Sequence, residues 1–150
     1  MSDAEAMAVS ALLLEAGAAL HERLERTLEE ACGLSLAKLG VLRHLAGAGG
    51  GLPLSWLAER LCCARSNVTQ LVDRLEAEGL VERRPNPADR RRVVAVITPE
   101  GRVRCERGLA ARARAQEEAL GRLGAGERAA LAALLRRLLA PDATGSGSAG

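Results

Sequence analysis

The sequence predicts a mainly α-helical fold with one small β-hairpin, formed by a single domain of 150 residues. First, 48% of the residues are hydrophobic but only 1% are aromatic, so leucine, alanine and valine must build the core, and leucine and alanine favour helices. Second, apolar residues recur three and four positions apart along most of the chain. Third, a run of β-branched residues at 93–97 follows a turn-rich segment, as is typical of a hairpin.

The first part of the chain predicts two helices before a glycine-rich break. Residues 4–30 carry apolar residues at helical spacing among charged ones, and Gly33 is expected to end this helix. Ser35 stands where it can cap a second helix, whose leucines recur every three residues. The segment 47–51, GAGGG, is expected to stop that helix.

Two further helices are expected next. Ser55 is placed to cap a short third helix, SWLAERL, and a fourth helix runs from about Arg65 to Glu78. Apolar residues of the fourth helix follow the i, i+3, i+4, i+7 spacing of one buried face: Val68, Leu71, Val72 and Leu75. Gly79 is expected to end this helix.

A β-hairpin and two more helices complete the expected order. Residues 80–83 and 93–97 predict two strands, and the turn between them contains two prolines. Thr98 at the cap position and Pro99 at the first helical position favour a fifth helix. A sixth helix follows, again with leucines at helical spacing.

The charged residues are distributed unevenly along the chain, although the net charge is only +2. Residues 1–53 hold four basic and seven acidic residues, whereas residues 54–104 hold ten basic and seven acidic residues. The basic excess thus begins where the turn-rich middle of the chain begins. This asymmetry is a weak indication of a nucleic-acid partner.

Composition disfavours several other classes of protein. No uninterrupted apolar run reaches the roughly 20 residues of a membrane span, and the acidic N-terminus does not resemble a signal peptide, so we expect a cytoplasmic protein with no membrane partner. The four cysteines form no CxxC pair, so neither a disulfide framework nor a zinc ribbon is expected. His21 and His44 lack the spacing of metal ligands, and we expect neither a metal nor a cofactor.

The fourth helix has the two faces that insertion into the major groove of DNA requires. Its apolar face can pack inward, while its N-terminal half gathers polar side chains that can bond to base edges. These side chains belong to Arg65, Ser66, Asn67, Thr69 and Gln70. The alternative is an ordinary amphipathic helix with a solvated polar face.

The turn of the hairpin concentrates positive charge. Five arginines surround it: Arg83, Arg84, Arg90, Arg91 and Arg92. Guanidinium groups this close repel one another unless an anion is near, and a hairpin lying along DNA meets that need, with an arginine in the narrow minor groove. Asp89 is expected to hold one of these side chains in a bidentate pair. The alternative is a solvated basic turn.

Residues 54–101 resemble the MarR (multiple antibiotic resistance regulator) family of winged helix-turn-helix proteins, and the helix order extends the similarity over about residues 5–140. The strongest match is Asp89-Arg90-Arg91 followed by ITPEG at 97–101, which fits the D-x-R and T-x-x-G pattern of the family's wing. The text VTQLVDRLEAEGLVERR also fits the family's helix-turn-helix.

The resemblance implies a DNA-binding transcriptional regulator that acts as a homodimer on pseudo-palindromic double-stranded DNA. It implies that Arg91 enters the minor groove with Asp89 as its orienting partner. The candidate major-groove or phosphate contacts are Arg65, Ser66, Asn67, Thr69, Gln70 and Arg74. The candidate wing contacts are Arg84, Asp89, Arg90, Arg91 and Arg92.

Three parts are expected within the domain. Residues 34–98 form the DNA-binding lobe. Residues 1–33 and 99–140 form a helical dimerisation region, because terminal helices this apolar need a partner and the resemblance implies that they interlock with those of a second copy. Residues 141–150 form a disordered tail.

The turn before the fourth helix departs from the family pattern. The usual Gly-Val-Ser is replaced by Cys62-Cys63-Ala64, so Ser66 is expected to cap the helix instead. Two adjacent thiols beside the DNA-reading helix raise a redox hypothesis, in which oxidation adds polar bulk or a crosslink there. The alternative is that both cysteines only pack, as free cysteines commonly do.

We expect a repressor that a small ligand or thiol oxidation releases from DNA. Relatives bind anionic ligands between the dimer and DNA-binding lobes, which makes Arg102, Arg104 and Arg107 candidate anchors; the alternative is a solvated helix face. Two other classes of protein compete with this expectation. One is an interaction adaptor without DNA binding, and the other is a cysteine enzyme that pairs the thiol of Cys62 or Cys63 with His44. No enzyme is expected, since nothing near these residues resembles an oxyanion hole.

Overall fold

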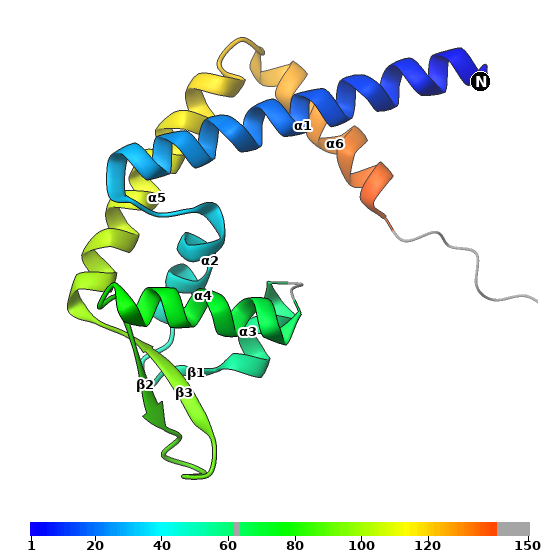
Figure 1. Cartoon of the computed structure of the whole chain (residues 1–150). Coiled ribbons are helices and arrows are strands. Elements are labelled where there is room, and N and C mark those ends of the chain that lie inside the picture. The colour runs from blue at the N-terminus through cyan, green and yellow to red at the C-terminus, as the bar shows by residue number, and fades with distance from the viewer. Residues whose placement is uncertain (62–63, 141–150) are drawn as a thin grey trace, which may run out of the picture. The chain divides into compact units, whose positions relative to one another are not determined.

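The computed structural model describes residues 1–61 and 64–140 (Figure 1). The chain divides into two compact units, Met1–Gln116 and Glu117–Gly150, with the boundary inside the fifth helix. The first unit contains the whole of the predicted DNA-binding lobe. The tail that we predict to be disordered, residues 141–150, lies outside the described residues.

Six helices and three short strands follow one another in the described ranges (Figure 1). The helices are α1 (Asp3–Cys32), α2 (Leu36–Ala46), α3 (Leu54–Arg60), α4 (Arg65–Ala77), α5 (Pro99–Leu120) and α6 (Ala125–Leu139). The strands are β1 (Leu52–Pro53), β2 (Val81–Pro85) and β3 (Val93–Ile97). This order confirms the predicted mainly α-helical fold with a β-hairpin between the fourth and fifth helices.

The three strands form one antiparallel sheet in the order β1-β3-β2. β2 and β3 make the predicted hairpin, and β1 adds two residues on the other edge of β3, with Leu52 opposite Ala95. The sequence does not predict β1, because two residues carry no strand periodicity. Gly51 precedes it with a φ of 88°, and a Cβ there would lie 2.8 Å from the Ala95 carbonyl oxygen. Only glycine allows this backbone approach.

The core of the first unit is aliphatic, as the composition predicts. Side chains with no exposed surface include Leu39, Leu42, Leu45, Leu57, Val68, Val72, Leu75 and Leu80. Three of these come from the predicted inner face of α4, and Leu71 of that face is half-buried. Burial of each large aliphatic side chain contributes roughly 1.5–3 kcal/mol. This packing fixes which side of α4 faces outward.

Two of the predicted helix boundaries are confirmed in detail. Gly33 ends α1 in the left-handed conformation, with a φ of 65° and its N–H donating to the Glu29 carbonyl. The Ser35 hydroxyl accepts a hydrogen bond from the Lys38 N–H at 3.1 Å and so caps α2.

Two predicted caps are wrong. α3 begins at Leu54, because the pairing of β1 brings the chain to Pro53 in an extended conformation, so Ser55 already lies inside the helix. α4 begins at Arg65 after Ala64, so Ser66 also lies inside its helix. Neither helix has a side-chain cap among the residues that the structure describes.

Helix α1 extends for 30 residues, and its N-terminal half exposes apolar side chains. Met7, Leu12 and Leu14 are 71%, 67% and 75% exposed. By length and composition alone, α1 is long and apolar enough to cross a membrane, although charged residues interrupt its apolar sequence. A single helix of this kind is weak evidence for a membrane span.

The second unit contains the end of α5 and all of α6. The Glu127 carboxylate accepts a hydrogen bond from the Gly124 N–H at 2.7 Å and so closes the start of α6. Two leucines of α6, Leu134 and Leu138, are 54% and 66% exposed. Like α1, α6 therefore presents apolar side chains that this chain alone leaves uncovered.

Candidate nucleic-acid interface

The outward face of α4 carries the polar residues that the sequence assigns to the major groove. All six are exposed: Arg65, Ser66, Asn67, Thr69, Gln70 and Arg74. Ser66 and Gln70 are four residues apart, so they lie on one side of the helix. The Thr69 hydroxyl donates to the Arg65 carbonyl at 2.9 Å, which leaves its oxygen able only to accept from another group.

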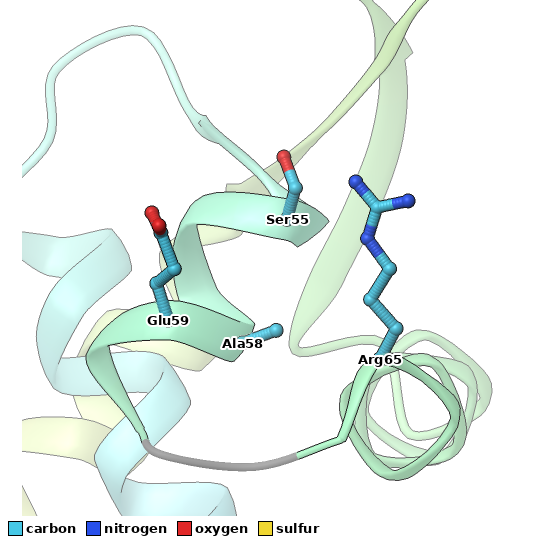
Figure 2. A pocket seen from close by; sticks show the side chains of 4 residues that line it. All are labelled: Ser55, Ala58, Glu59 and Arg65. Carbon is cyan, nitrogen blue, oxygen red and sulfur yellow. The ribbon is translucent and has the colours of Figure 1, made fainter.

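The start of α4 gathers groups that suit a phosphate. Ala64 has no side chain that can cap α4, so no side-chain cap occupies the first backbone N–H groups of the helix. These groups carry partial positive charge. Figure 2 shows the Arg65 side chain beside Ser55 of α3, at an open notch that Ala58 and Glu59 also line. The Arg65 guanidinium and the Ser55 hydroxyl are donors of the kind that position proteins on nucleic-acid backbones, whereas the Glu59 carboxylate at the same notch repels an anion.

The tip of the β2–β3 hairpin is ordered by two polar side chains of its own turn. The Asn86 carbonyl and side chain accept hydrogen bonds from Asp89 and Ala88, and the Asn86 N–H donates to Arg92 at 2.8 Å. Sequence reasoning overlooked Asn86, although asparagine before such a turn is a common signal. The hairpin extends away from α2, α3 and α4 (Figure 1) and holds Arg90, Arg91 and Arg92 exposed at its end.

Asp89 orients the backbone of this tip rather than gripping a guanidinium. One carboxylate oxygen accepts a hydrogen bond from the Arg91 N–H at 3.1 Å, and the other lies 3.8 Å from Nε of Arg92. The predicted bidentate pair is therefore wrong, because one carboxylate oxygen is taken by the turn itself. The exposed Arg91 side chain projects from a backbone that Asp89 holds.

Arg83 does not belong to the free positive charge of the hairpin. Its guanidinium bonds to Asp73 and Glu76, both on α4. Burial opposes the charged form, yet these two carboxylates raise the Arg83 pKa above its ordinary value. Arg84, in contrast, pairs with Glu82 of its own strand at 2.8 Å and is 61% exposed. Two exposed acidic residues on α4 were the overlooked signal, because paired carboxylates favour a nearby cation.

The arginines proposed as ligand anchors on α5 serve other helices. Arg102 donates to the Ala46 carbonyl at the end of α2, and Arg104 donates to the Cys32 carbonyl at the end of α1. Arg104 also lies 3.9 Å from Glu78, which follows α4. Both side chains therefore stabilise helix C-termini, while Arg107 is exposed.

The cysteines named in the redox hypothesis, Cys62 and Cys63, lie outside the described residues. Cys32 and Cys105 are free thiols in the core. Burial, followed by the charge of Glu106, raises the Cys105 pKa, which disfavours the reactive thiolate. Nothing in the described part of the chain groups three potential metal ligands.

His44, Trp56 and Arg60 form a local stack between α2 and α3. His44 of α2 meets Trp56 of α3 edge to face, with ring centroids 5.6 Å apart, and Arg60 lies over Trp56 at 5.1 Å. Burial, Arg43 and Arg60 lower the His44 pKa. This stack joins α2 to α3, which agrees with a packing role for Trp56.

Helix α4 with a polar outward face, a preceding short helix and a following basic hairpin define a winged helix-turn-helix protein. Comparison with known proteins specifies the family. A model described as the MarR family matches residues 33–92. A transcriptional regulatory protein proposed for the hcr operon of Thauera aromatica is 33% identical over 83% of this chain and 74% of its own length. The transcriptional repressor MdtR of Bacillus subtilis is 40% identical over 53% of this chain and 51% of its own length.

Solved structures of similar fold support the same family. Sco3205, a MarR family regulator from Streptomyces coelicolor solved in complex with DNA, is 28% identical with a TM-score of 0.82, covering 93% of this chain and 88% of that one. BpsR of Bordetella bronchiseptica, whose DNA binding is regulated by 6-hydroxynicotinic acid, is 28% identical with a TM-score of 0.77, covering 89% and 94%. The chain belongs to the MarR family of transcriptional regulators.

Proposed function

We propose that this regulator binds pseudo-palindromic double-stranded DNA in a sequence-specific manner, as a homodimer in the cytoplasm. One observation carries the proposal. The exposed polar face of α4 and the exposed arginines at the β2–β3 tip belong to adjacent elements of one unit, and both are free of the core. An α-helix fits the major groove, and a neighbouring arginine-bearing hairpin suits the backbone and the minor groove.

The site residues divide into two sets. From α4, the set that contacts base edges or phosphates is Arg65, Ser66, Asn67, Thr69, Gln70 and Arg74. From the hairpin, the set that contacts the DNA backbone and minor groove is Arg84, Asp89, Arg90, Arg91 and Arg92, in which Asp89 acts by holding the tip. A good bidentate contact to a base contributes about 1–3 kcal/mol of discrimination.

Dimerisation accounts for the apolar surface that each unit exposes. In the first unit, Leu12 and Leu14 on α1 are more than half exposed, and in the second unit Leu134 and Leu138 on α6 are as well. A second copy that covers these side chains removes a large apolar area from water. Residues 1–33 and 99–140 thus form the dimerisation region and residues 34–98 the DNA-binding lobe. Two α4 helices then read half-sites about one DNA turn apart.

This assignment of α1 also accounts for its apolar composition without a membrane. The helix is interrupted by charged residues such as Glu15, and its C-terminal part contributes the buried residues Leu24 and Leu28 to the core of the first unit. Such a helix is built to pack against protein.

We further propose that the regulator is a repressor released from DNA by a small anionic ligand. BpsR, a similar structure, has its DNA binding regulated by such a molecule. Because Arg102 and Arg104 hold helix ends, the ligand would either compete with those carbonyl contacts or use the exposed Arg107. Oxidation of Cys62 and Cys63 is the second candidate signal, supported by their sequence position shortly before α4.

The experiment that tests the function is selection of bound duplexes from a random DNA pool, with and without diamide. A regulator enriches a two-fold-related sequence, whereas an interaction adaptor or an enzyme enriches none. If thiols carry the signal, diamide abolishes enrichment by the wild type and not by the Cys62→Ser, Cys63→Ser double variant. Equal effects on both proteins remove the redox mechanism and leave the DNA-binding function standing.

A further inference from the structure

Two carboxylates on α4 work against DNA binding. Asp73 and Glu76 are exposed, at 58% and 41% of their side chains, on a helix whose outward face is proposed to meet DNA. Asp73 follows Gln70 by three residues, so it continues the stripe that Gln70 begins. Negative side chains near phosphates weaken association with DNA. Their presence here needs another explanation.

The explanation lies in the single cation that the two carboxylates share. Arg83 of β2 bonds to Asp73 through one terminal nitrogen and to Glu76 through the other. Its side chain is 27% exposed, which is less than either of its partners. A rigid guanidinium fork that bridges successive turns of a helix restrains the strand in direction as well as distance.

The place of Arg83 along the hairpin makes this restraint effective. The chain leaves α4 through Gly79, whose φ of 75° makes a sharp turn, and Leu80 and Val81 anchor the base of the hairpin in the core. Beyond Arg83, both Arg84 and Pro85 are exposed. Arg83 therefore bonds β2 to α4 at the point where the strand leaves the core, before the strand reaches the tip of the hairpin.

We propose that Arg83 is a positioning residue, which locks the β2–β3 hairpin to α4 so that both elements meet DNA at a fixed offset. The inference rests on the proposed DNA-binding function and deepens it. Arg83 itself touches no DNA. Its role is to couple the contacts of the tip to those of α4, so that a duplex with the correct sequence engages both at once.

The test replaces the two acidic partners of Arg83 and compares the affinity for random duplex with the affinity for the selected duplex. The proposal predicts that the two affinities change in opposite directions. Asp73→Asn with Glu76→Gln deletes two negative charges from the DNA-facing side. Electrostatics alone predicts tighter binding to every duplex. Positioning predicts tighter binding to random duplex but weaker binding to the duplex selected by the wild type. We expect the ratio of the two affinities to fall by about tenfold, within the range that couplings between contacting residues span.

Glu82→Gln is the matched control. It deletes one negative charge from the hairpin, where the double variant deletes two from α4, and it frees Arg84 without touching the Arg83 contacts. We expect it to tighten binding to both duplexes by a similar factor, with the affinity ratio unchanged. Footprints with two probes add a second readout, because hydroxyl radical attacks deoxyribose along the minor groove whereas dimethyl sulfate methylates guanine N7 in the major groove. In the double variant, protection from hydroxyl radical by the tip should fade while protection from dimethyl sulfate by α4 persists.

The outcomes separate the hypotheses. If the double variant keeps the wild-type affinity ratio, or raises it, Arg83 has no positioning role. If Arg83→Gln weakens binding and the double variant does not, Arg83 contacts DNA directly and the proposal is overturned. If the double variant loses affinity equally for both duplexes and melts at a lower temperature, Arg83 has a merely structural role. Arg83→Lys provides a milder second variant for this comparison. If the wild type prefers no duplex over random DNA, the proposed function fails instead.

Discussion

Replacing Gly101 with alanine should destabilise the first unit strongly, because the backbone of α5 touches the turn after α4 at this residue. A Cβ on Gly101 would lie 2.1 Å from the Leu80 carbonyl oxygen and 2.8 Å from Cγ1 of Ile97. Carbon and oxygen normally approach no closer than about 3.3 Å. The first contact is with backbone, so a change of rotamer cannot relieve it.

The surrounding hydrogen bonds prevent an easy retreat of either segment. The Thr98 N–H donates to the Leu80 carbonyl at 3.1 Å, and the Thr98 hydroxyl donates to the Gly79 carbonyl at 2.7 Å. The same hydroxyl accepts the Gly101 N–H at 3.0 Å. Moving α5 away from Leu80 therefore strains or breaks these bonds, and Leu80 itself has no exposed surface.

Overpacking of this kind costs about 1–3 kcal/mol, and more when backbone has to move. We expect a loss of about 3 kcal/mol or more in the free energy of unfolding. For a chain of this size, each kcal/mol lowers the melting temperature by about 2–4 °C, so Gly101→Ala should melt about 6–12 °C below the wild type. Circular dichroism melts at one fixed protein concentration measure the shift.

Gly126→Ala is the matched control, since Gly126 lies in the first turn of α6 and a Cβ there meets no atom within 4 Å. Alanine in place of glycine inside a helix should stabilise by about 0.5–1 kcal/mol. If Gly101→Ala melts within about 2 °C of the wild type, or together with the Gly126 variant, the contact with Leu80 is not the reason for this glycine.

Three further predictions concern recognition, assembly and pH. Gln70→Ala should weaken binding to the selected duplex by about 1–3 kcal/mol while leaving random duplex almost unaffected, as gel shifts on both would show. Leu12→Glu should convert the dimer to monomer in sedimentation velocity, because it places a charge on the apolar face of α1. Stability should fall as the pH drops below about 6.5, because burial, Arg43 and Arg60 lower the His44 pKa, so the unfolded chain binds the proton first. His44→Gln should remove that part of the pH dependence in urea titrations.

Each of these has a clear contrary result. Equal losses on selected and random duplexes would assign Gln70 to phosphates rather than bases. A Leu12→Glu protein that sediments like the wild type would show that α1 does not form the dimer interface. An unchanged slope of stability against pH in His44→Gln would mean that other groups take up the proton.

The order of the six helices and of the β2–β3 hairpin was predictable because hydrophobic spacing and glycines mark it directly, whereas β1 was not predicted. The inner face of α4 follows from its apolar positions, and the end of α1 follows from Gly33, whose left-handed conformation the structure confirms. The predicted caps at Ser55 and Ser66 were wrong because no periodic signal marks where these two helices begin. The start of α3 depends on β1, and the start of α4 depends on the extended backbone at Ala64.

The partners of charged residues were less predictable than their positions. The sequence shows five arginines around the hairpin turn but does not distinguish their roles. In the structure, Arg83 bonds to α4 and Arg84 pairs with Glu82, whereas the arginines at the tip remain exposed. Which way a strand residue points depends on the twist and register of the hairpin, which the sequence does not state. The same holds for Arg102 and Arg104, whose partners are carbonyls 56 and 72 residues away in the chain.

The central claim is that α4 and the hairpin tip together bind double-stranded DNA, and the salt dependence of binding tests it most directly. Fluorescence anisotropy of the selected duplex, measured from low to high salt, should show log Kd rising linearly with log salt concentration for the wild type. Arg91→Ala should weaken binding and reduce the slope by about one unit for each lost phosphate contact, with an unchanged melting temperature. If Arg91→Ala instead binds with the affinity and the slope of the wild type, the hairpin does not contact DNA and the account is wrong.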